Sequence, residues 1–474
     1  MQYGLIVDLR AIQDYIFASN RLKDNIGASY LVKHLFDDID NGDGFCGGGN
    51  LFRLCKDEDE VKEIIRNLSI KVYEKCPGLS FSACYIPDFD LDKYQESMSR
   101  LQLKLHTEKN SRIQQTTLPS YGINTQCSSS VYAAELVCET APDTGDLVSR
   151  VIHAKRQAST QAVSEAQKIY REALGDTFIL PENFEDLGQD KGNESFIAVV
   201  HIDGNQIGEL FQKQKSFSEG KALSKRIDDA CDKAFKGMLA LAVDQISNGK
   251  WKHYIKRLKK TGDKYYLPIR PLFIGGDDIT FISEGRLGLS LAMDFMDRFK
   301  ELLEDMDVSS SAGIALAKTN YPFYQIHKLA GMLCRSAKNK RKEQRSNLDY
   351  LDFHVINSSV NQDLAEVRKT YYRLGDGRNL CKRPFSSTDM GLMIQNAECM
   401  DKNWPNSKIK ELRSILYQTS DQSAAFEAQR KSRVDLKLPA TGFDPFTETL
   451  FVNNETIFLD MIELIEMLPL EDSK

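Results

Sequence analysis

Two adjacent aspartates at the tip of a short hairpin are the residues best suited to chemistry. Residues 268–283 have the sequence Pro-Ile-Arg-Pro-Leu-Phe-Ile-Gly-Gly-Asp-Asp-Ile-Thr-Phe-Ile-Ser, two apolar runs around a polar tip. Apolar and β-branched residues on both sides of glycines are typical of a β-hairpin. Gly275 and Gly276 allow a close backbone approach. Asp277 and Asp278 repel each other unless a cation lies between them, so the tip is either a divalent metal site or an ordinary polar turn.

A third carboxylate upstream favours the metal site. The apolar strand at 196–203 ends in Asp203. Gly204, Asn205 and Gln206 follow as a loop able to turn backbone N–H groups toward a phosphate. Three carboxylates meeting at one place suit two Mg²⁺ or Mn²⁺ ions that hold a triphosphate and activate a hydroxyl.

The surrounding elements explain why these acids should meet. After the first strand the periodicity predicts a helix, the hairpin, a second helix, a strand and a third helix, in the order βαββαβ. This order is typical of a ferredoxin-like sheet, in which the first strand pairs with the hairpin at the centre. The predicted elements after the strand are a helix at 217–247, the hairpin, a helix at 286–305, a strand at 308–317 and a helix at 321–344.

The N-terminal segment repeats this pattern, which predicts a second βαββαβ unit. Its elements are a strand at 3–8, a helical stretch at 11–40, a hairpin around 47–50, a helix at 58–76 and a strand at 79–86. The sequence Gly-Gly-Gly-Asn replaces the Gly-Gly-Asp-Asp tip, so this copy is not expected to hold catalytic metals. Gly48 and Gly49 can still approach a nucleotide. Asp8 is expected to cap the following helix rather than to bind metal.

We therefore expect an α+β chain with two palm-like domains of the nucleotidyl cyclase type, a helical linker and a helical C-terminal domain. The expected boundaries are a degenerate first palm at 1–115, a linker with a small hairpin and a helix at 116–194, a catalytic palm at 195–356 and the helical domain at 357–474.

Composition restricts the class of protein further. The net charge of −6 over 474 residues gives no global nucleic-acid footprint. No signal peptide and no membrane span are expected, and the ten cysteines contain no Cys-x-x-Cys pair, which is typical of reduced thiols in a cytoplasmic protein. The basic and aromatic run at 250–260 suits either single-stranded RNA or a solvated surface.

With these features together, the sequence resembles the large palm-domain subunit of type III CRISPR effector complexes, the cyclic-oligoadenylate synthase. The tip at 47–50 is similar to that family's degenerate first palm, and Asp203 with 275–278 to its active palm. The other matching stretches are Ile12-Gln-Asp-Tyr-Ile-Phe17, 21–29, Ser311-Ala-Gly-Ile-Ala-Leu-Ala317, Tyr321-Pro-Phe-Tyr324, Ser336-Ala-Lys338 and, more weakly, Arg383-Pro-Phe385.

This resemblance implies that ATP is polymerised and cyclised into a short oligoadenylate messenger in antiviral defence. It implies metal binding by Asp203 and Asp277, with Asp278 supporting them or binding metal as well. Lys338 would neutralise the triphosphate, and the acceptor nucleotide would lie between the palms. The nucleotide-binding residues implied are Gly204, Asn205, Gln206, Gly275, Gly276, Lys338, Gly48 and Gly49.

Two departures from the family pattern affect what is expected. No His-Asp dipeptide occurs, so the nuclease domain of many members and its DNase activity are not expected, and the paired cysteines of the zinc module are missing. The chain thus also resembles reduced, stand-alone palm polymerases, which leaves open assembly with guide RNA and effector subunits or into a homo-oligomer. Two alternatives remain: a scaffold or RNA-binding subunit, and a GTP-using dinucleotide cyclase, because no residue separates ATP from GTP.

Overall fold

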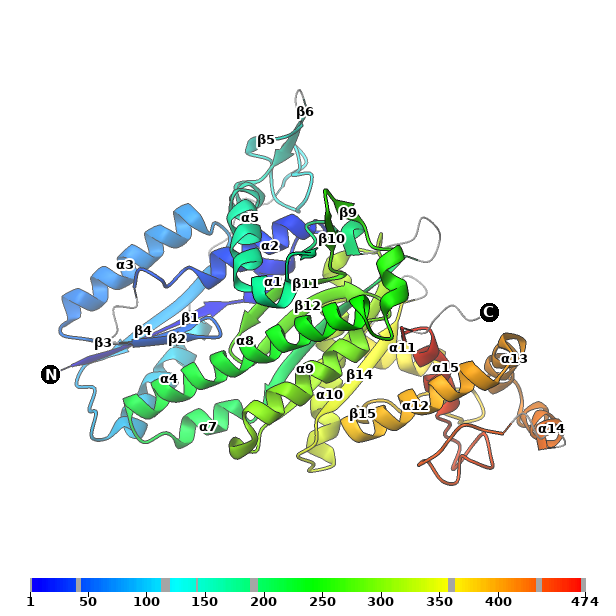
Figure 1. Ribbon diagram of the computed structural model, residues 1–474. Helices are drawn as coiled ribbons and strands as arrows, with labels where there is room; N and C mark the ends of the chain where they lie inside the picture. The colour runs from blue at the N-terminus through cyan, green and yellow to red at the C-terminus, as the bar shows by residue number, and fades with distance from the viewer. Residues whose placement is uncertain are drawn as a thin grey trace.

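Two sheets with the same strand order lie side by side in the computed structural model (Figure 1), which describes residues 2–39, 44–111, 120–141, 144–187, 195–356, 363–431 and 437–469. The first sheet has the order β2-β3-β1-β4, as in a ferredoxin-like domain. Its strands are β1 (Tyr3–Arg10), β2 (Gly44–Gly47), β3 (Asn50–Cys55) and β4 (Ser80–Ile86), and its helices are α1 (Ile12–Phe17), α2 (Leu22–Lys33), α3 (Glu58–Lys75) and α4 (Tyr94–Ser111).

The helical stretch expected at 11–40 is two helices, because a serine interrupts it. Ser19 Oγ accepts a hydrogen bond from the backbone N–H of Arg21 at 3.1 Å and donates one to Asp24 at 2.6 Å. A side chain that bonds nearby backbone in this way competes with the helix. The chain therefore turns between α1 and α2.

The second sheet repeats the first and then extends it. Its order is β11-β12-β8-β13-β14-β15, of which the first four strands form the predicted βαββαβ unit. The strands are β8 (Phe196–Asn205), β11 (Ile269–Gly275), β12 (Asp278–Glu284), β13 (Ser309–Lys318), β14 (Tyr350–Val355) and β15 (Phe385–Ser386). The helices are α7 (Ile207–Lys213), α8 (Phe217–Ser247), α9 (Gly288–Leu302) and α10 (Phe323–Glu343). The fold class expected from the sequence is confirmed.

Both faces of β8 are apolar because both are covered. Ala198, Val200 and Ile202 belong to the core that α8 and α9 close on one face of the sheet. Ile197 and Val199 belong to a second core, which α10 and the first domain share. Figure 1 shows α8 and α9 crossing one face of this sheet. A centrally placed strand buried on both faces loses the polar alternation of a surface strand.

The segment between the domains packs against the first sheet's helices. It contains a small hairpin and α5 (Arg150–Ile169), which crosses α2 so closely that a Cβ at Gly27 would lie 1.8 Å from Lys155 O. The strands of this hairpin are β5 and β6. The elements of this segment are β5 (Leu136–Ala141), β6 (Thr144–Val148), α5, α6 (Arg171–Leu174), β7 (Phe178–Ile179) and the 3₁₀ turn η1 (Phe184–Leu187).

The C-terminal part is helical except for β15, which joins the second sheet. The buried side chain of Arg383 connects the segment before β15 to α15. Its Nε lies 2.9 Å from Asp460 Oδ1, and its Nη2 donates a hydrogen bond to Glu463. No helix in the described ranges is long and apolar enough to cross a bilayer. The helices are α11 (Leu364–Tyr371), α12 (Ser387–Asn403), α13 (Asn406–Leu416), α14 (Ser420–Lys431) and α15 (Phe458–Ile465).

Gly313→Ala should destabilise the second domain by about 3 kcal/mol and misplace α10. A Cβ at Gly313 on β13 would lie 2.1 Å from Ala330 O and 2.3 Å from Cys334 N, both backbone atoms of α10. Only glycine lets the helix lie so close to the strand. Gly331→Ala on the same helix is the control, since a Cβ there meets nothing within 4 Å. Equal unfolding temperatures for the two variants would contradict this account.

Candidate nucleotide site between two palm domains

Strand pairing brings the hairpin tip to the end of β8. Asp278 on β12 is the cross-strand partner of Asp203 on β8, and Gly275 pairs with Asp278 across the tip. Gly276 has φ +64°, which glycine adopts without strain. The backbone N–H of Gly204 donates to Asp277 O at 3.0 Å, so the tip is fixed to the first strand. The juxtaposition expected from the βαββαβ order is therefore present.

Protein partners hold two of the three carboxylates. Lys338 Nζ on α10 lies 2.7 Å from Asp203 Oδ2. Asp278 Oδ2 accepts a hydrogen bond from Gln13 Nε2 at 2.8 Å, and its Oδ1 lies 3.4 Å from His201 Nδ1. Because Gln13 belongs to α1, the first domain contributes directly to this site.

The environment of the third carboxylate, that of Asp277, disfavours its ionised form. Burial, with the charges of Asp203 and Asp278 adding to it, raises the pKa of Asp277 to about 7. Burial also raises the pKa of Asp278. A divalent cation would compensate the negative charges of these carboxylates, and carboxylate oxygens are the ligands that Mg²⁺ and Mn²⁺ prefer.

The donor set fits such an ion by its chemistry. The described residues contain no group of three or more His, Cys, Asp or Glu side chains arranged around a metal position. Instead, the Asp203 carboxylate lies against Lys338, and the Asp278 carboxylate lies against Gln13 and His201. Metal binding by Asp203, Asp277 and Asp278 stays a prediction.

The expected phosphate loop starts later than the sequence suggested. Gly204 and Asn205 are the last residues of β8, and the Asn205 side chain bonds Ser309 and Ser311. Gln206, with φ +66°, makes the turn into α7. A Cβ at Gly204 would lie 2.7 Å from Asp277 Cβ, so this glycine makes room for the tip.

The first domain contains the same arrangement with weaker ligands. Asp8 on β1 is the cross-strand partner of Asn50 on β3, as Asp203 is of Asp278. Lys109 Nζ on α4 lies 2.8 Å from Asp8 Oδ2. The expectation that Asp8 caps a helix is wrong: α1 has no side-chain cap, because β1 continues to Arg10 and leaves Asp8 inside the strand. Lys109 was not predicted, although it takes the place of Lys338 in the repeat.

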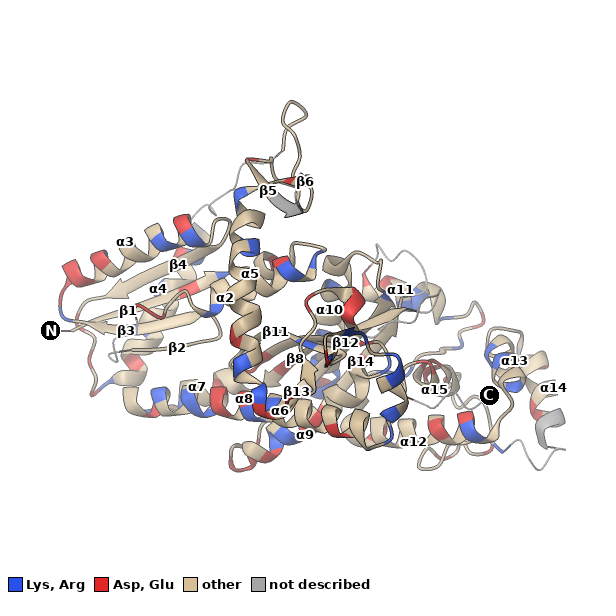
Figure 2. Ribbon diagram, turned by 45° about the horizontal axis from the view of Figure 1, so that its top comes forward, with Lys and Arg blue, Asp and Glu red and all other residues tan. Residues whose placement is uncertain are grey.

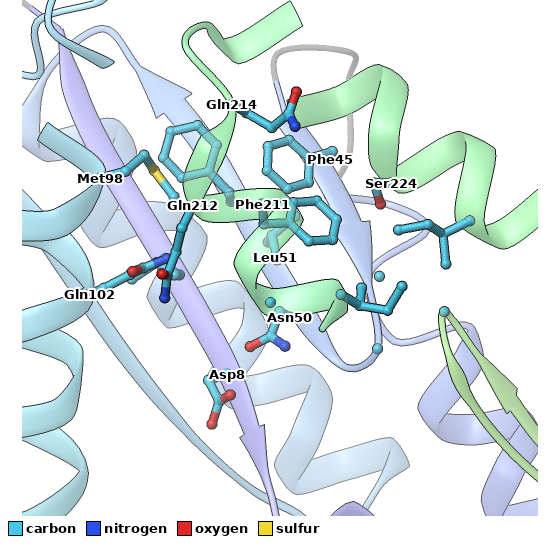
Figure 3. A pocket seen from close by; sticks show the side chains of 18 of the residues that line it. Asp8, Phe45, Asn50, Leu51, Met98, Gln102, Phe211, Gln212, Gln214 and Ser224 are labelled. Atoms are coloured by element: carbon cyan, nitrogen blue, oxygen red, sulfur yellow. The ribbon is translucent and has the colours of Figure 1, made fainter. Parts of the chain in front are cut away.

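A cavity of about 520 Å³ lies over the first domain's copy of the site (Figure 3). Both glycine tips line it and lie close together, since a Cβ at Gly276 would lie 3.8 Å from Gly48 N. Figure 3 shows Asp8 and Asn50 at one end of the cavity and Phe45 and Phe211 toward the other. The lining side chains that matter for binding are Asp8, Asn50 and Lys109 from the first domain and Phe211, Ser224 and Asp228 from the second.

The basic run at 250–260 does not offer aromatic rings to RNA. Trp251 is 7% exposed and Tyr254 is 1% exposed, so neither can stack on bases. Lys252, Lys256 and Lys260 remain at the surface. Acidic and basic residues are mixed over the molecule in the view of Figure 2. We therefore favour the interpretation of this run as a solvated surface over that of an RNA-binding site.

His327→Phe should make the chain less sensitive to acid. His327 on α10 stacks on Phe17 of α1 at 3.8 Å, and burial lowers its pKa to about 3. A base whose pKa is depressed on folding stabilises the fold above the unfolded value of about 6.5, and this stability is lost as pH falls toward 3. The loss from pH 7 to pH 5 amounts to about 2 kcal/mol. Denaturant unfolding at both pH values measures it.

The phenylalanine variant should lose that much less stability over the same interval, because it keeps the stacking contact and removes the titrating group. The control is His106→Phe, exposed on α4. A pH effect equal in the wild-type chain and His327→Phe would show that this imidazole is not responsible.

Comparisons with known proteins agree with this geometry. Residues 196–347 match the family model described as Cas10/Cmr2, second palm domain. The fold is similar to that of a Csm1-Csm4 cassette in complex with cA4, with 14% identity over 98% of this chain and 69% of the other and a TM-score of 0.57. A cassette in complex with cA3 gives 13% identity, coverage of 99% and 70%, and a TM-score of 0.56. A cassette with one ATP gives 13% identity over 99% and 70%, and a TM-score of 0.53. None of the curated proteins matches the sequence.

Proposed function

We propose, because residues 196–347 match the second palm domain of Cas10/Cmr2, that the chain is a metal-dependent nucleotidyltransferase of type III CRISPR defence. It joins ATP molecules into a cyclic oligoadenylate. The observation that carries this proposal is the meeting of Asp203, Asp277 and Asp278 with Lys338 at the end of β8. A scaffold without catalysis gains nothing from the cost of crowded carboxylates.

Asp203 and Asp277 would hold the divalent ions, Mg²⁺ or Mn²⁺, with Asp278 supporting them. When bound, these ions neutralise phosphate charge and increase the acidity of the attacking 3′-hydroxyl. Gln13 and His201 orient the Asp278 carboxyl. Lys338 is 27% exposed and close to the tip, so its ammonium group can reach the β- and γ-phosphates of the donor ATP.

The cavity over the first domain would hold the acceptor nucleotide. Lys109, Asn50 and Gly48 line it, and Gly48 has a positive φ, which lets the backbone approach a ligand closely. Gly49 does not line this cavity, because it packs against Ile12. The apolar rings of Phe45 and Phe211 are suited to an adenine base. Because both tips line this cavity, the acceptor hydroxyl lies near the catalytic hairpin.

The oligomeric context is proposed from the similar structures. Those proteins were solved with Csm4 as a partner. We propose that this chain also assembles with an effector subunit, with guide RNA in the complex. Activity of the isolated chain would instead favour a stand-alone polymerase.

The test is the purified chain incubated with Mg²⁺ or Mn²⁺ and with each nucleoside triphosphate separately. Cyclic oligoadenylate, separated by chromatography, should form from ATP alone, in the isolated chain or after target RNA and effector subunits are added. If a cyclic product formed from GTP and not from ATP, the substrate would be GTP. No product from any triphosphate under either condition would refute the function.

A further inference from the structure

Arg270 on β11 is a buried cation without a hydrogen-bond partner for two of its donors. Its side chain is 2% exposed, and among the residues that the structure describes none accepts from its Nε or Nη1. Burial lowers the pKa of Arg270 to about 10, so the group stays charged at neutral pH. Burying an unpaired charge is costly, and proteins normally satisfy such donors.

The nearest acid does not supply the missing bonds. The charge of Glu182 acts on Arg270, but the Glu182 carboxylate lies 3.2 Å from Lys23 Nζ. Another buried arginine offers a contrast, because Arg383 lies against Asp460 and Glu463. Arg383 is thus paired with two acids, whereas Nε and Nη1 of Arg270 have no acceptor among the described residues.

Arg270 faces a second cavity, of about 490 Å³, which shares the glycine tips and Asp228 with the first cavity but contains neither Lys109 nor Lys338. Residues of α2, α5, α8 and β11 line it, and Tyr170 lines it close to Arg270. Both Arg270 and Gly275 line it, five residues apart on β11, which is roughly 17 Å along a strand. The cavity therefore extends from the arginine to the glycine tips.

The tip end of this cavity offers acceptors instead of donors. Asp228 on α8 accepts from the backbone N–H of Gly276. Asp229 and Asp232 of the same helix also line the cavity. A ligand that matches both ends carries an anionic group for the guanidinium and N–H or O–H donors for the carboxylates. A nucleoside monophosphate has this polarity, with a phosphate at one end and ribose hydroxyls and a base amine at the other.

We propose that this cavity is a second nucleotide pocket, in which Arg270 binds the phosphate and the aspartates of α8 accept hydrogen bonds from the nucleoside. Tyr30 and Lys33 of the first domain and β11 and α8 of the second enclose the same ligand. A bound nucleotide would hold the two palm domains together behind their tips. The proposal does not depend on turnover, and its failure would leave the proposed function untouched.

The experiment is a calorimetric titration of AMP into the full chain carrying Lys109→Met and Lys338→Met, which weaken binding in the catalytic region. AMP should still bind. Adding Arg270→Met should weaken AMP binding at least tenfold, because charge-assisted hydrogen bonds to the phosphate are lost, and Arg270→Lys should retain part of it. Equal affinity with and without Arg270→Met would overturn the proposal. Pyrophosphate binding as tightly as AMP would overturn the assignment to a nucleotide.

A stability measurement separates a ligand site from a structural arginine. Without ligand, Arg270→Met should unfold at the same temperature as the parent chain or higher, because an unpaired buried charge is replaced by an apolar group of similar length. Arg383→Met, which breaks a paired buried arginine, should unfold at a clearly lower temperature. A loss of stability in Arg270→Met comparable with that of Arg383→Met would overturn the proposal.

Discussion

Replacing both tip aspartates, as Asp277→Ala/Asp278→Ala, should lower oligoadenylate synthesis by at least a thousandfold. Removing one preorganised electrostatic group from an active site costs about 10²–10³ in rate, and this change removes two of three carboxylates at the end of β8. Phosphoryl transfer depends on positioning and charge neutralisation, so no other side chain can take over the function. Product formed from ATP per unit time, followed by chromatography, measures the effect.

The same double variant should remain folded, which separates lost chemistry from lost structure. Burial and neighbouring charges raise the pKa of Asp277 in the folded state. An acid whose pKa is raised on folding favours the fold at low pH, and this contribution is lost as pH rises through about 7. The alanine variant should therefore be at least as stable as the parent chain at pH 8. Asp263→Ala, exposed in the turn after β9 (Lys260–Thr261), is the control for turnover. Turnover unchanged in the double variant would discredit the site.

The sheet and its register could be predicted because they depend on local patterns. Apolar runs, glycine tips and the order βαββαβ determine which strands pair, and pairing alone places Asp278 opposite Asp203. The internal repeat was visible for the same reason. The expectation for Asp8 failed at a strand end, because β1 continues two residues past Asp8 before α1 begins. Boundaries of this kind depend on how the following helix packs and not on the strand's own sequence.

Long-range partners were harder to predict. Lys109 lies on a helix far along the chain from Asp8, and nothing in its neighbourhood distinguishes it from solvated lysines such as Lys104. Aligning the two repeats would have found it, since the last helix of each unit supplies a lysine to the aspartate of its first strand. The burial of Arg270 could not be predicted either, because an arginine near the start of an edge strand is usually exposed. The helices that pack on β11 and cover it are α2 and α8.

The addition of β15 to the second sheet could not be predicted for a different reason. A strand of two residues is too short to show the alternation of apolar and polar residues that predicts a strand. These two residues pair with Tyr350 and Leu351 of β14. The buried contacts of Arg383 with α15 hold them in place. The sequence therefore indicated a helical C-terminal domain without a strand joined to the second sheet.

Substituting the two repeat-related lysines should separate the roles of the two palm domains. Lys338→Met should lower kcat about 100-fold, because its ammonium is the cation beside the catalytic carboxylates and a charge-assisted bond to phosphate is worth about 1.5–3 kcal/mol. Lys109→Met should raise KM for ATP about tenfold with a smaller effect on kcat. The first palm has Asn50 where the second has Asp278, so it binds a nucleotide without activating it. Initial rates over a range of ATP concentrations measure both constants.

Two neighbouring lysines provide matched controls on the same helices. Lys340 on α10 lies 3.9 Å from Glu343, and Lys104 on α4 donates to Tyr85 O at 2.8 Å, so neither faces a candidate site. Their methionine variants should retain parental kcat and KM. If Lys109→Met lowered kcat as strongly as Lys338→Met, both palms would take part in the chemical step, and the Gly-Gly-Gly-Asn tip would not mark an inactive copy. If neither variant changed either constant, the aspartate–lysine pairs would only stabilise the fold, because a cation that binds the triphosphate cannot be removed without a kinetic effect.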